Sequence, residues 1–471
     1  MRKPAETRPS PRATRACDVV GRRSRGPSGE ALSAKLSSAW LGTSATSTAI
    51  LLCGLATGIL SARLLAPEGR GALAAVLFWP QLITSLGLLN LPSAMIFRRG
   101  RPDVDRAAVA AAGAWLALGL SAIGALAGHL ALPLLLRDGA AAALAQLYLI
   151  AFLPFNFLAL ALLALDQSDL RFARYNLTRL LPSGVYLVGL LVLCALDAVS
   201  VASLVWACWL GTAVTALVRL CHSRDALRAR PSLAEARRLV VTGARLHGAA
   251  LLAALLAQAD RFVVITFWDH ATLGLYVVAL TLAAAGLDVV TGAFGALLLP
   301  RLAAAKDAEA HRRIMGQTLR YATLLLTAGT ALLLILCPWL LPFLFGDAYA
   351  GAVVICLMLL VAYLPTALRF IIIHGLAGTG DWRPRILAQG LALVTFAVAV
   401  RPLAARLGIL GIPTALFIAN GVALAYLLVF LRRRLALSSR ECWGLSLTTA
   451  RQVWWHGRAL VRDARPAAAN G

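Results

Sequence analysis

Charged side chains inside long apolar segments are the residues of this sequence whose chemistry most needs an explanation. Asp260 and Arg261 interrupt one apolar run, and Asp288 lies in the middle of the next. Arg369 lies near the end of a later run. Ionisable residues are costly inside a membrane, so they mark binding sites or transport pathways by default. A guanidinium there can bind an anionic group, and a carboxylate can exchange a proton or another cation.

Each of these residues has a functional and a structural interpretation. Arg261 is expected to contact an anionic substrate group, and Asp260 to tune that contact or to couple transport to a cation. The alternative is an ion pair that holds their helix to a neighbour. Arg369 either contacts substrate or extends to the nearby surface. Asp288 is a candidate for cation coupling, against a hydrogen-bonded structural role.

Amide side chains within the apolar segments form a second group of candidates. They either line a path for a sugar or bridge neighbouring helices, which is the commoner role of such groups. The candidates are Asn90, Gln146, Asn156, Gln258, Gln389 and Asn420. Asn90, Asn156 and Gln258 are predicted to contact substrate together with Arg261, Asp260 and Arg369.

The composition indicates a membrane protein. Of 471 residues, 60% are hydrophobic and 14% charged, whereas soluble domains average about 45–50% and about 25%. The net charge of +24 would suggest nucleic acid in a soluble protein. Here the basic residues stand between apolar runs, so no nucleic-acid partner is expected. The eight cysteines form no CxxC pair, and neither a disulfide framework nor a metal site or cofactor is expected.

Twelve apolar runs are long enough to span a bilayer, which takes about 20 residues. The connections between them alternate between many and few Lys and Arg residues. Because basic connections are cytoplasmic, the alternation predicts an even number of spans with both termini in the cytoplasm. The expected spans are 36–61, 71–97, 107–136, 142–165, 178–196, 198–220, 241–267, 271–299, 318–345, 349–373, 384–404 and 408–431.

The longest basic connection divides the spans into two sets of six, and similar turns separate the spans of each set. A short polar turn with a glycine, at 65–72 and again at 268–276, follows the first span of each half. Two halves with an even number of spans enter the membrane in the same direction, which implies parallel repeats. We therefore expect an all-α membrane protein of two six-helix bundles related by a pseudo-twofold axis along the membrane normal. The expected domains are a disordered basic tail (1–35), the first bundle (36–220), a cytoplasmic linker (221–240), the second bundle (241–434) and a cytoplasmic tail (435–471).

Three motifs carry a resemblance to a known family. The run 62–71, ARLLAPEGRG, resembles the first-hairpin signature of polysaccharide flippases of the multidrug/oligosaccharidyl-lipid/polysaccharide exporter superfamily. Residues 258–262, QADRF, followed by 273–276, LGLY, are similar to the hairpin that opens the second half. Residues 407–411, LGILG, are similar to the turn before the last helix. The resemblance covers about residues 36–434.

The resemblance implies a two-bundle exporter rather than an enzyme. Its expected substrate is an oligosaccharide on polyprenyl pyrophosphate, moved from the inner to the outer leaflet of a bacterial inner membrane by alternating access through a cationic cleft. Expected partners are this glycan lipid, membrane lipids and polysaccharide-assembly enzymes. The alternative is a cation-coupled multidrug or small-molecule exporter of the same superfamily. An ATP-driven pump is disfavoured because no GxxxxGK[ST] motif is present.

Overall fold

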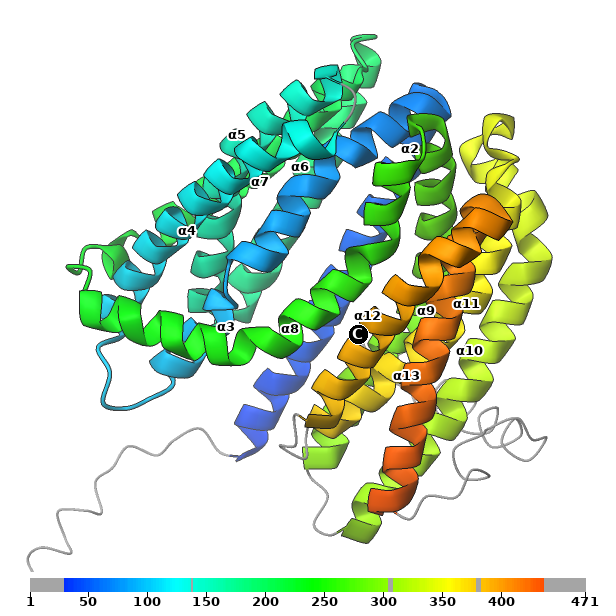
Figure 1. The fold of residues 1–471 in the computed structure, drawn as a ribbon. Helices are drawn as coiled ribbons and strands as arrows, with labels where there is room; N and C mark the ends of the chain where they lie inside the picture. Colours follow the sequence, from blue (N-terminus) through cyan, green and yellow to red (C-terminus); the bar gives the residue numbers. More distant parts are fainter. Residues whose placement is uncertain (1–28, 137–138, 304–307, 378–382, 436–471) are drawn as a thin grey trace, which may run out of the picture.

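The chain folds into helices throughout the part that the structure describes. The computed structural model describes residues 29–136, 139–303, 308–377 and 383–435 (Figure 1). These residues contain long helices, two short 3₁₀ turns and no strand. The helices are α2 (Gly29–Gly87), α3 (Leu91–Arg99), α4 (Arg106–Leu135), α5 (Gly139–Ser168), α6 (Phe172–Ala195), α7 (Val201–Leu227), α8 (Leu233–Phe267), α9 (His270–Ala303), α10 (Ala308–Phe345), α11 (Ala352–Ala377), α12 (Arg383–Leu407) and α13 (Gly411–Leu435), with η2 (Asp347–Tyr349) and η3 (Gly408–Leu410) between them. The all-α prediction is confirmed.

The number of membrane spans agrees with the sequence. Among the described residues, ten segments are long and apolar enough to cross a membrane. Two of these segments each contain two helices. Gly42–Gly87 bends at Ala66, and Arg383–Arg434 is interrupted by η3. Counting these separately gives the predicted twelve spanning helices.

The bend in α2 has a local cause in the sequence. Ala66 adopts φ 55° and ψ 176°, outside the helical region, and it precedes Pro67. Proline disfavours helical backbone in the residue before it and lacks an N–H of its own. A second break separates α2 from α3, where Leu89 and Asn90 have φ of 50° and 52°. The second arm of α2 therefore ends in a turn that brings Asn90 to the inside of the molecule.

The helices form two bundles that lie side by side (Figure 1). The N-bundle holds α2 to α7, and the C-bundle holds α8 to α13. The first part of α8 crosses below the N-bundle, where it contacts α3 and α4, and its later part runs beside α12. At the crossing, Arg98 Nη2 lies 3.0 and 2.9 Å from the two carboxylate oxygens of Glu235. This ion pair fastens the start of α8 to the opposite bundle.

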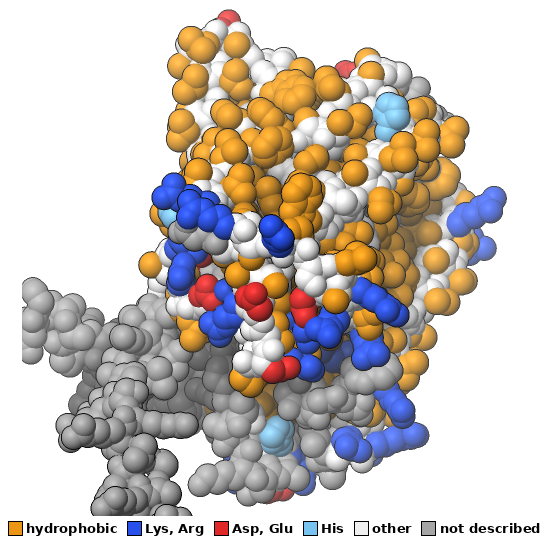
Figure 2. All heavy atoms as spheres, turned by 90° about the vertical axis from the view of Figure 1, so that its left-hand side faces the viewer, with side chains coloured by type: hydrophobic (Ala, Val, Ile, Leu, Met, Phe, Trp, Pro, Cys, Tyr) orange, Lys and Arg blue, Asp and Glu red, His pale blue; other side chains and the backbone are white. Residues whose placement is uncertain are grey.

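The two ends of the bundles differ in charge. We call the end where α2 begins and α13 finishes the basic end, and the end with the turns at 66–71, 268–269 and 346–351 the turn end. Figure 2 shows a hydrophobic surface over the upper part of the N-bundle, with Lys and Arg gathered below it toward the basic end. Large apolar side chains face outward, such as Leu134 (87% exposed) and Phe343 (75%). Such a surface suits a lipid environment, and the chain is a multi-pass membrane protein.

At the turn end the two bundles touch backbone to backbone. A Cβ atom added to Gly71 would lie 1.7 Å from the carbonyl oxygen of His270, and one added to Gly274 would lie 1.9 Å from that of Pro67. Contacts this short do not occur, so only glycine fits either position. The contact is reciprocal, because each turn offers a glycine to a carbonyl of the other. These two turns are the glycine-containing polar turns that the sequence shows at matching places in the two halves.

Hydrogen bonds close the turn end further. The hydroxyl of Tyr349 in η2 donates to the carbonyl oxygen of Ala62 at 3.0 Å. Arg63 donates to the carbonyl oxygens of Leu344, at 2.8 Å from Nε, and of Phe343. Tyr349 thus joins η2 to α2, and Arg63 joins α2 to the final turn of α10. The turn end is sealed by main-chain contacts, which leave little room for adjustment.

We expect Gly71→Ala to separate the bundles at the turn end, because its methyl group overlaps a carbonyl oxygen. The measurement is the maleimide labelling rate of Ala62→Cys in a cysteine-free protein in lipid nanodiscs. Ala62 is 0% exposed, so the parent should label slowly and the Gly71→Ala variant at least about ten times faster, since each decade corresponds to about 1.4 kcal/mol.

The matched control is Gly54→Ala on the same helix, where an added Cβ meets no atom within 4 Å. This substitution should leave the labelling rate unchanged and the helix slightly more stable. Equal labelling of the Gly71→Ala protein and its parent would show that the glycine contact does not hold the bundles together.

Candidate functional site

A cavity of about 1010 Å³ lies between the bundles, mostly against the C-bundle. Its walls come from the start of α3 and from α8, α9, α11, α12 and α13. Near the basic end it is lined by Asn90, Ser93, Arg245, His374 and Arg385. Deeper in, it reaches Asp260, Arg261, Arg369 and Leu416. Because the turn end is closed by the glycine contact, the cavity is a pocket that extends from the basic end.

The ionisable lining is predominantly cationic. Arg245, Arg261, Arg369 and Arg385 line the cavity, and Asp260 is the one carboxylate among its described lining residues. Arg369 lies eight residues before the end of α11, about 12 Å from the basic end, and Arg261 six residues before the end of α8, about 9 Å from the turn end. The cations are therefore spread along the depth of the pocket. Walls of low dielectric concentrate such a field on any anion that enters.

Arg369 is held in place by neutral groups. Its Nε donates to Asn420 Oδ1 at 3.0 Å, and its Nη1 donates to Gln389 Oε1. Asn420 is itself fixed by a 2.9 Å bond from its Nδ2 to the carbonyl oxygen of Leu416. The side chain of Arg369 forms no ion pair with a described carboxylate. Its orientation is fixed, and no carboxylate among the described residues offsets its charge.

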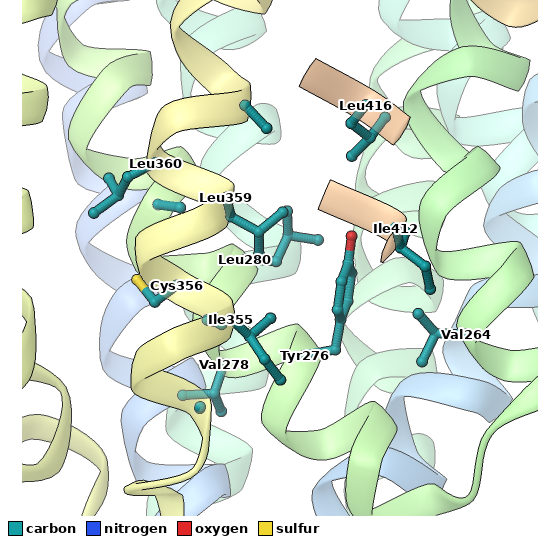
Figure 3. Close-up of a cluster of buried hydrophobic side chains, with 14 of the residues drawn as sticks. Val264, Tyr276, Val278, Leu280, Ile355, Cys356, Leu359, Leu360, Ile412 and Leu416 are labelled. Atoms are coloured by element: carbon teal, nitrogen blue, oxygen red, sulfur yellow. The ribbon is translucent and has the colours of Figure 1, made fainter. Parts of the chain in front are cut away.

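Asp260 is paired with a hydroxyl rather than with its neighbour in sequence. Tyr276 on α9 donates to Asp260 Oδ2 at 2.9 Å, and both residues are buried. Figure 3 shows Tyr276 rising through a cluster of buried side chains that includes Val264, Ile355 and Ile412. The bond ties α8 to α9 at the deep end of the cavity. One carboxylate oxygen of Asp260 therefore accepts a hydrogen bond from a neutral donor.

Arg261 has no carboxylate partner among the described residues. Its Nη2 donates to the carbonyl oxygen of Ala257 at 3.2 Å, one turn earlier on the same helix. Its Nε is enclosed and forms no hydrogen bond. An ion pair between Asp260 and Arg261 is absent, as expected for consecutive helical residues that point in different directions. Arg261 therefore contributes to the pocket a second positive charge that no described carboxylate offsets.

Of the other residues predicted to contact substrate, the structure places some on the cavity wall and some away from it. Asn90 lines the cavity and donates from Nδ2 to the carbonyl oxygen of Leu246 at 3.3 Å. Asn156 lies within the N-bundle and bridges α5 to α2 through a 2.9 Å bond to Thr84. Gln258 is half-buried outside the cavity lining, and its Oε1 lacks a partner. The side chain of Asp288 lies outside the described part of the structure.

Two cavity arginines were missed by the sequence reasoning. Arg245 and Arg385 stand at the ends of apolar segments, where basic residues also mark cytoplasmic connections. In the structure both are already inside helices, α8 and α12, and line the mouth of the pocket. Their sequence positions carry a weak signal: Arg245 lies twelve residues into α8, and Arg385 two residues into α12. Which face they occupy depends on how the helices pack.

Comparisons with solved structures identify the fold. An inward-closed lipid II flippase MurJ superposes with a TM-score of 0.70 at 13% identity, covering 83% of this chain and 87% of that one. An inward-facing multidrug resistance MATE family transporter of the MOP superfamily gives 0.68 at 20% identity, covering 82% and 94%. A MOP superfamily transporter from Pyrococcus furiosus gives 0.59 at 19% identity, covering 86% and 95%. The two-bundle transporter fold predicted from the sequence is confirmed.

The comparison with protein families identifies the relatives by sequence. A search of curated proteins finds no match. The family model described as polysaccharide biosynthesis protein matches residues 60–354, which is more than half of the chain. The match begins just before the turn at Ala66 and ends early in α11, so it includes both turns of the glycine contact and the Asp260–Tyr276 pair. The chain therefore belongs to the polysaccharide biosynthesis protein family.

Proposed function

We propose that this protein moves a polyprenyl-pyrophosphate-linked oligosaccharide between the leaflets of a bacterial inner membrane, for the synthesis of a surface polysaccharide. The substrate enters the central cavity from the basic end and leaves at the turn end after the bundles have moved. The family match to polysaccharide biosynthesis proteins and the likeness in fold to a lipid II flippase support this class of substrate.

The observation that carries the proposal is the amide-held Arg369. A protein that needed this arginine only for structure would gain most from a carboxylate partner, because charge-assisted pairs are the strongest hydrogen bonds. Gln389 and Asn420 instead fix the guanidinium without cancelling its charge. The cation remains available to a pyrophosphate, and Arg261 supplies a second charge deeper along the path. Guanidinium groups suit phosphate oxygens because they can bind two of them at once.

The sugar part of the substrate needs neutral hydrogen-bonding groups. Asn90, Thr366 and Gln389 lie on the cavity wall and can serve this role. The excess of Lys and Arg at the basic end supports the proposal that this end faces the cytoplasm, with both termini on that side. Glycan-assembly enzymes on that face are the proposed suppliers of the substrate.

Export of cationic drugs is the second candidate function, since MATE multidrug transporters share the fold. The cavity charge argues against it. A cationic compound would meet four arginines and one carboxylate, and that carboxylate is already bonded to Tyr276.

The first prediction concerns transport itself. In proteoliposomes, wild type should transfer a labelled polyprenyl-pyrophosphate oligosaccharide between leaflets, and Arg261→Ala and Arg369→Gln should each slow transfer by about tenfold or more, consistent with losing a charge-assisted bond worth about 1.5–3 kcal/mol. Arg406→Gln, an exposed arginine at the turn end of α12, is the control and should transfer normally. Drug efflux without glycan-lipid transfer by wild type would favour the exporter.

A second prediction separates the charge of Arg369 from its position. Gln389→Glu keeps an oxygen acceptor where Arg369 donates, but it adds a negative charge that neutralises the guanidinium. Transfer should fall about tenfold or more while folding is retained, because a close pair of opposite charges is worth on the order of 1–4 kcal/mol. Gln317→Glu, on the exposed face of α10, adds the same charge elsewhere and should have no effect. Normal transfer by Gln389→Glu would rule out the cationic-cavity mechanism.

A third prediction tests Asp260 as the group that couples transport to a cation. Asp260→Asn keeps an acceptor for Tyr276 but cannot bind or release a proton. Transfer driven by a proton or sodium gradient should be lost, while exchange in the absence of a gradient continues. Loss of both would instead indicate a structural role, which Tyr276→Phe should reproduce by leaving a buried carboxylate unbonded.

A further inference from the structure

A further arginine with no partner among the described residues lies in the N-bundle, away from the central cavity. Arg70 stands on the second arm of α2, one residue before the glycine that contacts His270. It is half-buried, and its Nε is enclosed without a hydrogen-bond partner. The described residues provide no ion pair or hydrogen bond to its guanidinium.

The surroundings of Arg70 contain hydroxyl and thiol groups instead of acids. The ionisable groups close enough to act on it are Tyr186 on α6, Cys208 on α7 and Tyr349 in η2. No carboxylate is among them. Glu68, two residues earlier, is exposed. Tyr349 already donates to Ala62, and the hydroxyl of Tyr186 lies near the sulfur of Cys208.

Without a bound anion, the positive charge of Arg70 is poorly compensated. Removing a cation from water without an opposite charge costs several kcal/mol, and the neighbouring hydroxyls offer only partial compensation. An oxyanion beside Arg70 would supply the missing charge and accept from its N–H groups. The hydroxyl of Tyr186 could turn from the weak acceptor sulfur of Cys208 to a stronger oxygen acceptor.

The same face of α6 carries a further cation toward the basic end. Tyr175, Arg179 and Tyr186 are spaced so that they lie on one side of the helix. The guanidinium of Arg179 lies 5.2 Å from the ring centroid of Tyr175, and its Nη2 lies 3.4 Å from Ser47 Oγ on α2. The N-bundle therefore has a polar face along α6 that leads to Arg70, separate from the cavity lined by the C-bundle.

We propose that Arg70 and Tyr186 form a second oxyanion site, in the N-bundle near the turn end, that binds a phosphate or diphosphate group. Its place beside Gly71 puts it next to the contact that closes this end, so separation of the bundles there would uncover it. An anion leaving the central cavity could be received at this position. That the anion is the diphosphate of the glycan lipid rests on the proposed function, whereas the site itself does not.

The experiment is isothermal titration calorimetry with inorganic pyrophosphate on the full-length protein in nanodiscs. The background is Arg261→Gln with Arg369→Gln, which removes the two deep cations of the central cavity. Pyrophosphate should still bind to this protein. Adding Arg70→Gln should weaken the remaining binding at least about tenfold, and Tyr186→Phe should weaken it less. Arg70→Lys keeps the charge and should retain most of the affinity, which excludes a folding defect at this position.

Arg406→Gln in the same background is the matched control and should bind as its parent does. Equal affinity with and without Arg70→Gln would overturn the site, as would the absence of any binding in the background protein. Binding at Arg70 by a protein that fails to transfer the glycan lipid would leave the site standing and remove the proposed function. Competition by a polyprenyl pyrophosphate at lower concentration than by free pyrophosphate would assign the lipid-linked source.

Discussion

An arginine deep in a membrane protein needs acceptors for its five N–H donors and a means of offsetting its charge. At Arg369, two amide oxygens meet part of the first need, and no described carboxylate meets the second. Gln389 comes from α12 and Asn420 from α13, so three helices must keep their register for the guanidinium to stay in place. The packing of α11, α12 and α13 around the basic half of the C-bundle serves this requirement.

The closure at the turn end depends on a different constraint, the absence of side chains. Gly71 and Gly274 let two turns meet at backbone distance, and this fixes the separation of the bundles there. At the basic end the links are ion pairs within the N-bundle and between it and α8, such as Arg98 with Glu235. Those pairs hold α3, α5, α6 and α8 together without filling the space between the bundles. Because the bundles touch at the turn end and leave space between them at the basic end, the pocket is open from the basic end.

The number of spans and the division into two halves could be predicted from sequence, because a bilayer forces every spanning segment to be long, apolar and helical. The site could be predicted only in part. Asp260 and Arg261 stood out as charges, yet the partner of Asp260 is Tyr276, and that pairing depends on how α8 and α9 are rotated. Arg245 and Arg385 resemble loop charges, since hydropathy does not distinguish a cavity mouth from a connection.

The charges and the closing contact lie on the same short pieces of chain. Arg70 precedes Gly71 directly, while Gly274 is two residues from Tyr276, which holds Asp260. Movement of either turn must therefore move a charged group. Arginines without counter-charges repel one another, and this repulsion grows as water is excluded from around them. Closing the basic end over an empty pocket is then unfavourable, whereas an anion among the arginines removes the repulsion. Under the proposed function, these cations make closure depend on the presence of an anionic substrate, which is the property an alternating-access transporter requires.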